Sequence, residues 1–316
     1  MNPLVWLLVF SGSILFITLL TSFICFYKVF YSPKRKILGE DEYEIPDGEI
    51  YEVFRDDIIA WTKQARSLAH EDMEITSYDG LTLRGKYYEY KKGAITELLF
   101  HGYQGNAERD LSGGIERCFA LGRNALIIDN RASGTSDGSV ITFGVREKRD
   151  VLSWVDFSIR HFGEDVKLVL TGVSMGAATV LMSSGEPLPK NVVCVLADCP
   201  YSSQKEIIKK VIRDMKLPDK LLYPFVKLGA RIFGGFNLEE DTPIEAMTRC
   251  SVPIILIHGD TDAFVPHVMS DELYDACSSQ HKRNVKIPGA GHGLAFPVGK
   301  EAYINALADF ENEWNI

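Results

Sequence analysis

Short, nearly unbroken apolar runs alternate with segments of helical periodicity over most of the chain. Six of these runs predict strands that are buried on both faces of a sheet: residues 95–102, 124–131, 166–172, 191–200, 252–260 and 284–293. The segments between them predict helices over residues 107–122, 144–162, 176–184, 266–280 and 299–313. Because strands that alternate with helices form right-handed βαβ units, the pattern indicates an α/β protein with a mostly parallel, doubly wound sheet.

Two runs of alternating apolar and polar residues, MEITSYDG (73–80) and LTLRGKYYEY (81–90), precede this region. Asp79 and Gly80 form a strong turn signal between the two runs, which therefore predict a pair of antiparallel strands. Before them, residues 39–70 are polar and predict a helical linker that docks on the domain. The apolar face of this linker is predicted to consist of Val53, Phe54, Ile58, Ile59 and Trp61.

The N-terminal stretch carries no charge before Lys28 and is mostly apolar. As a helix, about 24 of its residues measure about 36 Å, which is enough to cross a bilayer. A cleaved signal peptide would carry a basic segment and a small-residue cleavage site, and the sequence shows neither clearly. Basic residues follow the span and none precedes it, so the positive-inside rule places the following domain in the cytoplasm, with an extracytoplasmic domain as the alternative. The basic residues are Lys28, Lys34, Arg35 and Lys36.

The chain thus divides into a transmembrane helix (1–30), a docking linker (31–72) and a catalytic domain (73–316) with a small helical cap at about 201–248. The first cap helix is predicted to begin at a capping box, Ser203 to Glu206, and to end at Pro218. Its basic face consists of Lys205, Lys209, Arg213, Lys216 and Lys220. Its apolar face consists of Ile208, Val211, Ile212 and Met215.

Composition and charge exclude several classes of function. The net charge of -9 argues against a nucleic-acid-binding surface. The six cysteines form no C-x-x-C pair and have no histidine spacing typical of zinc, so no metal site is predicted. Cys194 and Cys199 lie on one predicted strand, about 16 Å apart and too far for a disulfide. Free thiols in a reducing compartment are the simplest interpretation.

Polar residues follow four of the predicted strands, at the edge of the sheet where ligands of α/β proteins bind. They are Ser174, Asp262, His292 and the segment HGYQGN (101–106). The G-x-S-x-G pattern around Ser174 is weak by itself, since 26 glycines make a chance match expected in about one such chain in seven. A strand that turns directly into a helix nevertheless needs small residues on both sides of such a serine. Asp198 and Asp260 also end strands and are rival acids.

Five motifs follow one another along the chain: HGYQGN, DNRASGTSDG, GVSMG, HGDTDAFVP and GAGHG. In this order they resemble the Bem46-like and serine aminopeptidase-like serine hydrolases, and residues 73–316 resemble the α/β-hydrolase fold. Relatives usually carry a pattern closer to D-x-R-G-x-G-x-S where this chain has Ala132 and Ser133. No catalytic atom is expected at those two positions.

The resemblance implies a role for each site residue. Ser174 would be the nucleophile, His292 its general base and Asp262 the acid that orients the histidine. The backbone N–H groups of Tyr103 and Met175 would hold the oxyanion, and no metal or organic cofactor is implied. Gln104 and Asn106 are expected to shape the oxyanion loop. His101 and His258 are expected to be packed, hydrogen-bonded residues.

The chemistry predicted is acyl transfer to water through an acyl-enzyme, on a small-molecule or lipid acyl substrate. A membrane-tethered esterase or lipase-like enzyme is the first hypothesis. Residues 205–231 of the cap contain eight basic and three acidic residues and would lie against anionic lipid headgroups. The acyl chain of the substrate would then enter beneath the cap. A serine peptidase is the alternative, with Glu239, Glu240 and Asp241 as candidates that capture a substrate amine. A non-catalytic binding protein of the same fold is more remote.

Overall fold

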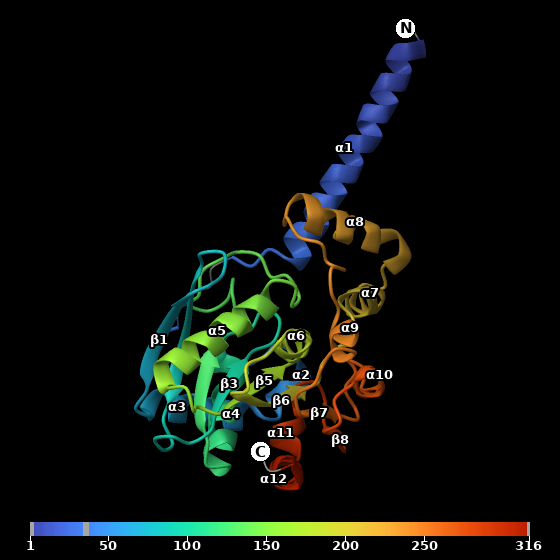
Figure 1. Cartoon of the computed structure of the whole chain (residues 1–316). Helices are drawn as coiled ribbons and strands as arrows, with labels where there is room; N and C mark the ends of the chain where they lie inside the picture. The colour runs from blue at the N-terminus through green and yellow to red at the C-terminus, as the bar shows by residue number, and fades with distance from the viewer. Residues whose placement is uncertain (1–2, 34–37, 315–316) are drawn as a thin grey trace.

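One mixed sheet forms the centre of the protein (Figure 1). The computed structural model describes residues 3–33 and 38–314. Within these residues, eight strands are ordered β1-β2-β4-β3-β5-β6-β7-β8, with β1 and β2 antiparallel to their neighbours and all other pairs parallel. The strands are β1 (Glu71–Thr76), β2 (Thr82–Tyr88), β3 (Thr96–Phe100), β4 (Asn124–Ile128), β5 (Leu168–Val173), β6 (Val192–Asp198), β7 (Ile254–Gly259) and β8 (Lys282–Ile287). The predicted doubly wound sheet with antiparallel N-terminal strands is confirmed.

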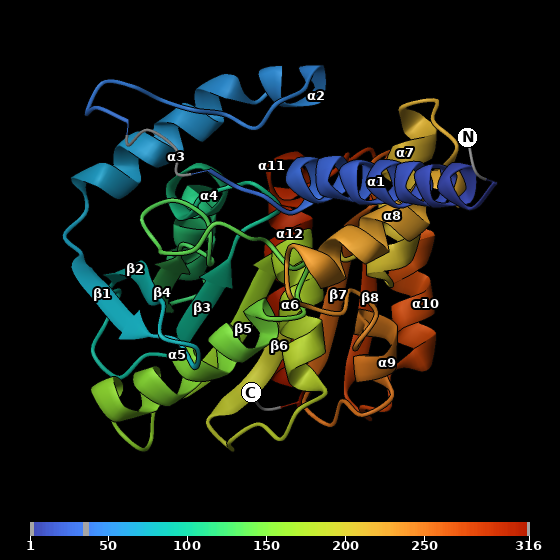
Figure 2. The ribbon, with the colours of Figure 1, turned by 90° about the horizontal axis from the view of Figure 1, so that it is seen from above.

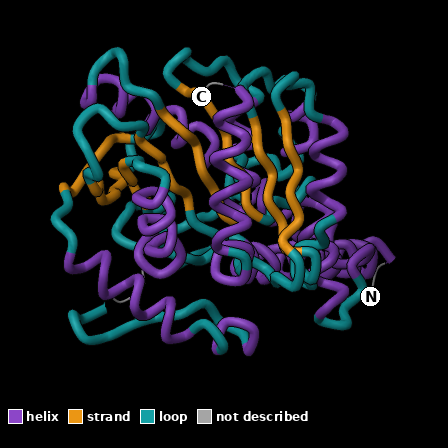
Figure 3. Tube along the Cα trace, turned by 90° about the horizontal axis from the view of Figure 1, so that it is seen from below, coloured by secondary structure: helices purple, strands orange, loops and turns teal. Residues whose placement is uncertain are grey.

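Helices cover both faces of the sheet (Figures 2 and 3). This arrangement explains why β3, β4 and β7 are buried at every position, whereas β1, at the edge, alternates between exposed and buried residues. Trp154 and Leu181 pack on one face, and Leu111 and Phe310 on the other. The helices of the first face are α5 (Glu147–Phe162), α6 (Met175–Ser184) and α10 (Val268–Ala276), and those of the second are α4 (Ala107–Ala120) and α12 (Lys300–Trp314).

The strand predicted over 284–293 is too long, because β8 ends at Ile287. The glycine-rich residues that follow form a loop, in which Gly289 and Gly293 have φ angles of 74° and 66°. These angles lie in the left-handed region that favours glycine. His292 therefore lies on a loop beyond the sheet, and a short helix, α11 (Ala295–Val298), follows it.

The apolar N-terminal helix, α1 (Pro3–Val29), is long and apolar enough to cross a membrane. Figure 1 shows it projecting from the domain, with α8 (Asp219–Ile232) across its base. Gly229 makes this crossing close, because a Cβ atom there would lie only 2.4 Å from the carbonyl oxygen of Ser22. The last turns of α1 are therefore packed against the cap.

The chain directly after α1 is also fixed to the domain. Phe26 and Phe30 are buried in the apolar cluster that contains the inner side chains of the cap. Tyr31 forms a β-bridge with Val140, and the backbone N–H of Ser32 donates to the Ser139 carbonyl at 2.9 Å. Three of the basic residues used to predict the orientation, Lys34, Arg35 and Lys36, lie outside the described residues.

The linker contains two helices, α2 (Glu49–Glu52) and α3 (Arg55–Ser67), and α3 packs on α4. Its buried face consists of Ile58, Thr62 and Ala65. The prediction that Val53 belongs to the apolar face is wrong, because this side chain is 81% exposed. Val53 lies in the turn between the two helices, where the helical periodicity used for the prediction does not apply.

The cap consists of α7 (Gln204–Asp214), α8 and α9 (Pro243–Met247). The predicted capping box does not form, since the Ser203 side chain makes no capping hydrogen bond. The helix ends at Asp214, so Met215 is 64% exposed and does not belong to the inner face. Ile207 is buried in its place, together with the predicted Ile208 and Ile212.

Candidate active site

Ser174 lies on a sharp turn between β5 and α6. Its φ and ψ angles are 56° and −115°, a region that residues with a Cβ atom rarely adopt. A Cβ atom on Gly172 would lie 2.2 Å from the Gly176 backbone, and one on Gly176 would lie 2.1 Å from the Phe100 carbonyl oxygen. Both glycines are therefore required for the strand, the turn and the helix to approach this closely.

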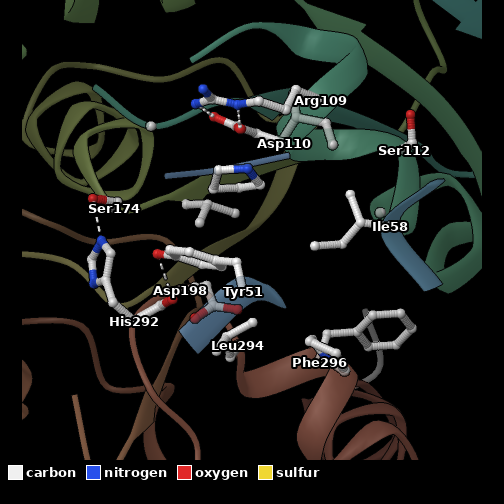
Figure 4. A pocket seen from close by; sticks show the side chains of 18 of the residues that line it. Tyr51, Ile58, Arg109, Asp110, Ser112, Ser174, Asp198, His292, Leu294 and Phe296 are labelled. Carbon is white, nitrogen blue, oxygen red and sulfur yellow. Dashed lines mark hydrogen bonds and ion pairs between the residues drawn. The ribbon is translucent and has the colours of Figure 1, made fainter. Parts of the chain in front are cut away.

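A chain of hydrogen bonds joins Ser174, His292 and Asp262 (Figure 4). The distance from Ser174 Oγ to His292 Nε2 is 2.8 Å, and that from His292 Nδ1 to Asp262 Oδ2 is 2.7 Å. With the Nδ1–H donating to the carboxylate, Nε2 is free to accept the serine proton. The three residues come from the turn after β5 and the loops after β7 and β8, and all three are buried.

Both oxygens of the Asp262 carboxylate have partners. Oδ1 accepts the backbone N–H groups of Phe264 and Val265 at 2.9 and 2.8 Å. Oδ2 lies 3.2 Å from Nε2 of the buried His258, which also donates to the Val265 carbonyl at 2.9 Å. Burial raises the pKa of Asp262, but the hydrogen bonds from His258, His292 and Val265 outweigh it and hold the pKa well below its usual range. Asp262 therefore carries a full negative charge at neutral pH.

His258 is packed and hydrogen-bonded, as the sequence predicts, and one of its partners is the acid Asp262. It lies at the end of β7, four residues before Asp262, and it donates to the same carboxylate oxygen as His292. The four-residue spacing between His258 and Asp262 is the feature of the sequence that points to this contact. That spacing alone does not show which way the imidazole points. We assign His258 to positioning, since it contacts the carboxylate of Asp262.

The two rival acids make other contacts. Asp260 Oδ1 accepts the backbone N–H of Gly289 at 2.7 Å and so stabilises the glycine-rich loop. Asp198 Oδ2 accepts the hydroxyl of Tyr303 at 3.0 Å, and Oδ1 has no hydrogen-bond partner within the described residues. Burial raises the pKa of Asp198 to about 6. The acid that contacts His292 is thus Asp262, the residue to which the motif resemblance points.

The predicted oxyanion loop lies directly beside Ser174. A Cβ atom on Gly102 would be 3.6 Å from the Ser174 Cβ atom, so the next amide, that of Tyr103, is close to the serine. As the first residue of α6, Met175 has no intrahelical partner for its own N–H. Asn106 caps α4 by accepting the Arg109 N–H at 2.8 Å, and Gln104 donates to the Tyr103 hydroxyl at 3.1 Å.

His101 is buried and packed, as the sequence predicts. Its Nε2 accepts the backbone N–H of Asn130 at 3.0 Å, which leaves the proton on Nδ1, 2.7 Å from the Gly102 carbonyl. Burial lowers the pKa of His101 and favours this neutral form. In the neighbouring loop, Ala132 has a φ angle of 60°, which lies in the left-handed region that favours glycine.

A cavity of about 680 Å³ lies beside Ser174 and His292. Its walls come from the linker, from α4 and from α11, and Figure 4 shows Tyr51, Ile58 and Phe296 around it. No described residue of α7 or α8 lines it. This cavity therefore does not lie beneath the cap, and α8 of the cap packs on α1.

One group of potential metal ligands falls within this site. A donor atom each of Cys199, Asp262 and His292 lies within 4.8 Å of the others. The carboxylate and the imidazole already bind each other, and burial raises the pKa of the Cys199 thiol far above its usual range. The same carboxylate and imidazole form the hydrogen-bond chain with Ser174, and we assign them to that chain.

Comparison with known proteins finds similar sequences and similar structures. The family described as "Serine hydrolase (FSH1)" matches residues 225–296, which include Asp262 and His292. The Pyrococcus furiosus esterase Pf2001 superposes with a TM-score of 0.67 and 24% identity, covering 90% of this chain and 98% of that one. The chain has the α/β-hydrolase fold. The match over residues 225–296 supports the enzyme class predicted from the sequence, a serine hydrolase.

Relatives of the hydrolase include the proteins to which its motifs point. Protein bem46 of Schizosaccharomyces pombe is 25% identical over 263 residues, which cover 80% of this chain and 81% of that protein. YfhR of Escherichia coli (strain K12) is 26% identical over 317 residues, which cover 94% and 93%. The predicted resemblance to Bem46-like proteins is confirmed.

Proposed function

We propose that this hydrolase is a membrane-tethered carboxylesterase that cleaves acyl esters through an acyl-enzyme on Ser174. The observation that carries the proposal is the buried hydrogen-bond chain from Ser174 through His292 to Asp262. A serine hydroxyl is a poor nucleophile at neutral pH, and a neutral imidazole at 2.8 Å supplies the base it needs.

In the first half of this reaction, Ser174 Oγ forms a bond to the ester carbonyl carbon and its proton moves to His292 Nε2. The carbonyl electrons move to the oxygen, which the N–H groups of Tyr103 and Met175 stabilise, helped by the N-terminus of α6. Asp262 stabilises the imidazolium without taking its proton. The bond to the leaving alcohol then breaks, and the alcohol takes the proton from His292.

Water completes the cycle by the same steps. His292 accepts a proton from a water molecule as its oxygen attacks the acyl carbon, and the tetrahedral intermediate again uses the two amides. Its collapse breaks the bond to Ser174 Oγ, returns the proton to the serine and releases the carboxylic acid. The proposal requires no metal and no organic cofactor.

The three carboxylates that the sequence offers for amine capture do not surround the site. The carboxylates considered for amine capture are paired elsewhere: Glu239 binds Tyr223 at 2.8 Å, and Asp241 binds Lys148 at 2.8 Å. None of Glu239, Glu240 and Asp241 lines the described cavity. The similarity to a protein titled an esterase agrees with an ester substrate.

The proposed tether is α1. Its first 18 residues, about 27 Å as a helix, match the thickness of a hydrocarbon core, and the remaining turns pack on α8. Lys216, Lys220 and Arg231 are exposed beside exposed Leu221 and Ile232, which supports contact of the cap with anionic headgroups. The positive charge that follows the span favours a cytoplasmic catalytic domain.

The test is a substrate panel on the full-length chain in detergent. We expect hydrolysis of p-nitrophenyl esters to exceed hydrolysis of aminoacyl p-nitroanilides, and Ser174→Ala to abolish it. Faster turnover of the amides would favour the serine peptidase. Equal ester turnover by wild type and Ser174→Ala would refute the proposed nucleophile.

A further inference from the structure

The cavity beside Ser174 is bounded by a segment that lies outside the hydrolase domain in the sequence. Residues 46–51 and the α3 side chains Ile58 and Trp61 form one wall, and α4 forms the facing wall. Figure 4 shows Ile58 between Ser112 and Phe296, at the end of the cavity opposite Ser174, with its side chain directed into the cavity. The linker thus encloses space that would otherwise be open to solvent.

Several contacts fix this wall to the catalytic domain. The Tyr51 hydroxyl donates to the backbone carbonyl of His292 at 3.0 Å. Arg66 Nη2 binds Glu108 at 2.6 Å, and the indole N–H of Trp61 donates to Glu116. A Cβ atom on Gly113 would lie 2.8 Å from the Trp61 ring. The fit of the ring against a glycine shows that α3 and α4 are closely packed.

The wall and its surroundings present many apolar side chains to the cavity. They are Ile50, Ile58, Trp61, Leu99, Leu111, Val173, Leu294 and Phe296. The volume of about 680 Å³ lies within the range of about 300–1,000 Å³ for small-molecule sites. An unbranched alkyl chain that begins at Ser174 would be removed from water along such a surface.

We propose that the linker and α4 together form the acyl-chain site, and that Ile58 limits the length of the chain it accepts. This inference rests on the proposed esterase function and names its substrate class, an ester of a medium-length unbranched fatty acid. The cap does not take this role, because Phe26 and Phe30 of α1 pack against its inner face.

The test compares p-nitrophenyl acetate, butyrate, octanoate and laurate on the full-length wild type and on Ile58→Trp. In wild type, each methylene up to octanoate should raise kcat/KM about fourfold, which corresponds to about 0.8 kcal/mol per buried CH₂. In Ile58→Trp the octanoate-to-acetate ratio of kcat/KM should fall by about tenfold or more, with acetate within about twofold of wild type. Val53→Trp is the matched control, because that side chain lies on the same segment and points to solvent.

Labelling by a small fluorophosphonate separates the outcomes. A labelled Ile58→Trp enzyme with the wild-type chain-length profile would overturn the acyl-site inference and leave the esterase intact. A wild type that is not labelled would overturn the proposed function instead. If Ile58→Trp does not fold, Ile58→Phe decides, with a smaller fall in the same ratio expected.

Discussion

The hydroxyl of Tyr103 donates a hydrogen bond of 2.8 Å to the backbone carbonyl oxygen of Val29, the last residue of α1. Tyr103 also packs on Phe143, with ring centroids 5.1 Å apart. The amide of the same residue is a proposed oxyanion donor. The end of the apolar helix therefore contacts the loop on which the proposed transition-state stabilisation depends.

Tyr103→Phe should lower kcat more than it raises KM. The variant keeps the packing of the ring and loses the two hydrogen bonds of the hydroxyl, to the Val29 carbonyl and from Gln104. We expect a fall of about threefold to tenfold in kcat and a loss of about 1 kcal/mol in stability. Steady-state kinetics and thermal unfolding measure both. Tyr90→Phe, an exposed tyrosine on another loop, is the control. Unchanged kcat in Tyr103→Phe would show that the oxyanion loop holds its position without α1.

His258→Ala should reduce kcat about tenfold, because Asp262 loses a donor and the Val265 carbonyl loses its partner. His258→Gln retains an N–H at a similar distance from the backbone and should recover most of this loss. Recovery of kcat in His258→Gln would show that His258 orients Asp262 and does not act through packing alone. Equal activity of His258→Ala and wild type would refute the positioning role.

Asp198→Asn should stabilise the protein at neutral and alkaline pH. Burial raises the folded-state pKa of Asp198 from 3.8 to about 6, so the folded state binds the proton more tightly than the unfolded chain does. The folded state therefore loses stability as the pH rises from about 4 through the folded-state pKa of about 6. The variant should exceed wild type by up to about 3 kcal/mol at pH 8, and the difference should vanish below about pH 4.

The measurement is the thermal unfolding midpoint of both proteins between pH 4 and pH 8. The asparagine can still accept the Tyr303 hydroxyl, so the variant tests the charge and not the hydrogen bond. A difference that does not change with pH would contradict the raised pKa.

Gly176→Ala should prevent folding or cost more than about 3 kcal/mol, since its Cβ atom would overlap the Phe100 carbonyl at the end of β3. Gly39→Ala is the control, because its Cβ atom would meet its nearest neighbour, Glu42, at an ordinary 3.7 Å. The yield and the thermal unfolding midpoint of the two variants test whether position 176 must be glycine. A stable Gly176→Ala protein would show that the turn can widen.

The sequence predicts well the elements that depend on residues close together in the chain. Apolar runs identify the buried strands, and two glycines on either side of Ser174 identify a turn that no larger residue allows. The positions of Asp262 and His292 follow from strands that end at one edge of the sheet. Their roles come from the resemblance of the motifs.

The contacts that the sequence does not predict join segments far apart in the chain. Tyr51 and His292 are separated by 241 residues, and nothing in the polar linker indicates that it walls a cavity. Helical periodicity also fails where helices end, which is why Val53 and Met215 are exposed. The ends of the strands alone do not distinguish Asp262 from Asp198 and Asp260. The resemblance of the motifs selects Asp262, and the geometry of the loops agrees.

The most direct test of the account is peptide mapping of the full-length protein after reaction with a fluorophosphonate. We expect one adduct, on Ser174, that is absent in Ser174→Ala and forms far more slowly in His292→Ala. Folded wild-type protein that gains no adduct, or gains it on another serine, would contradict the central claim.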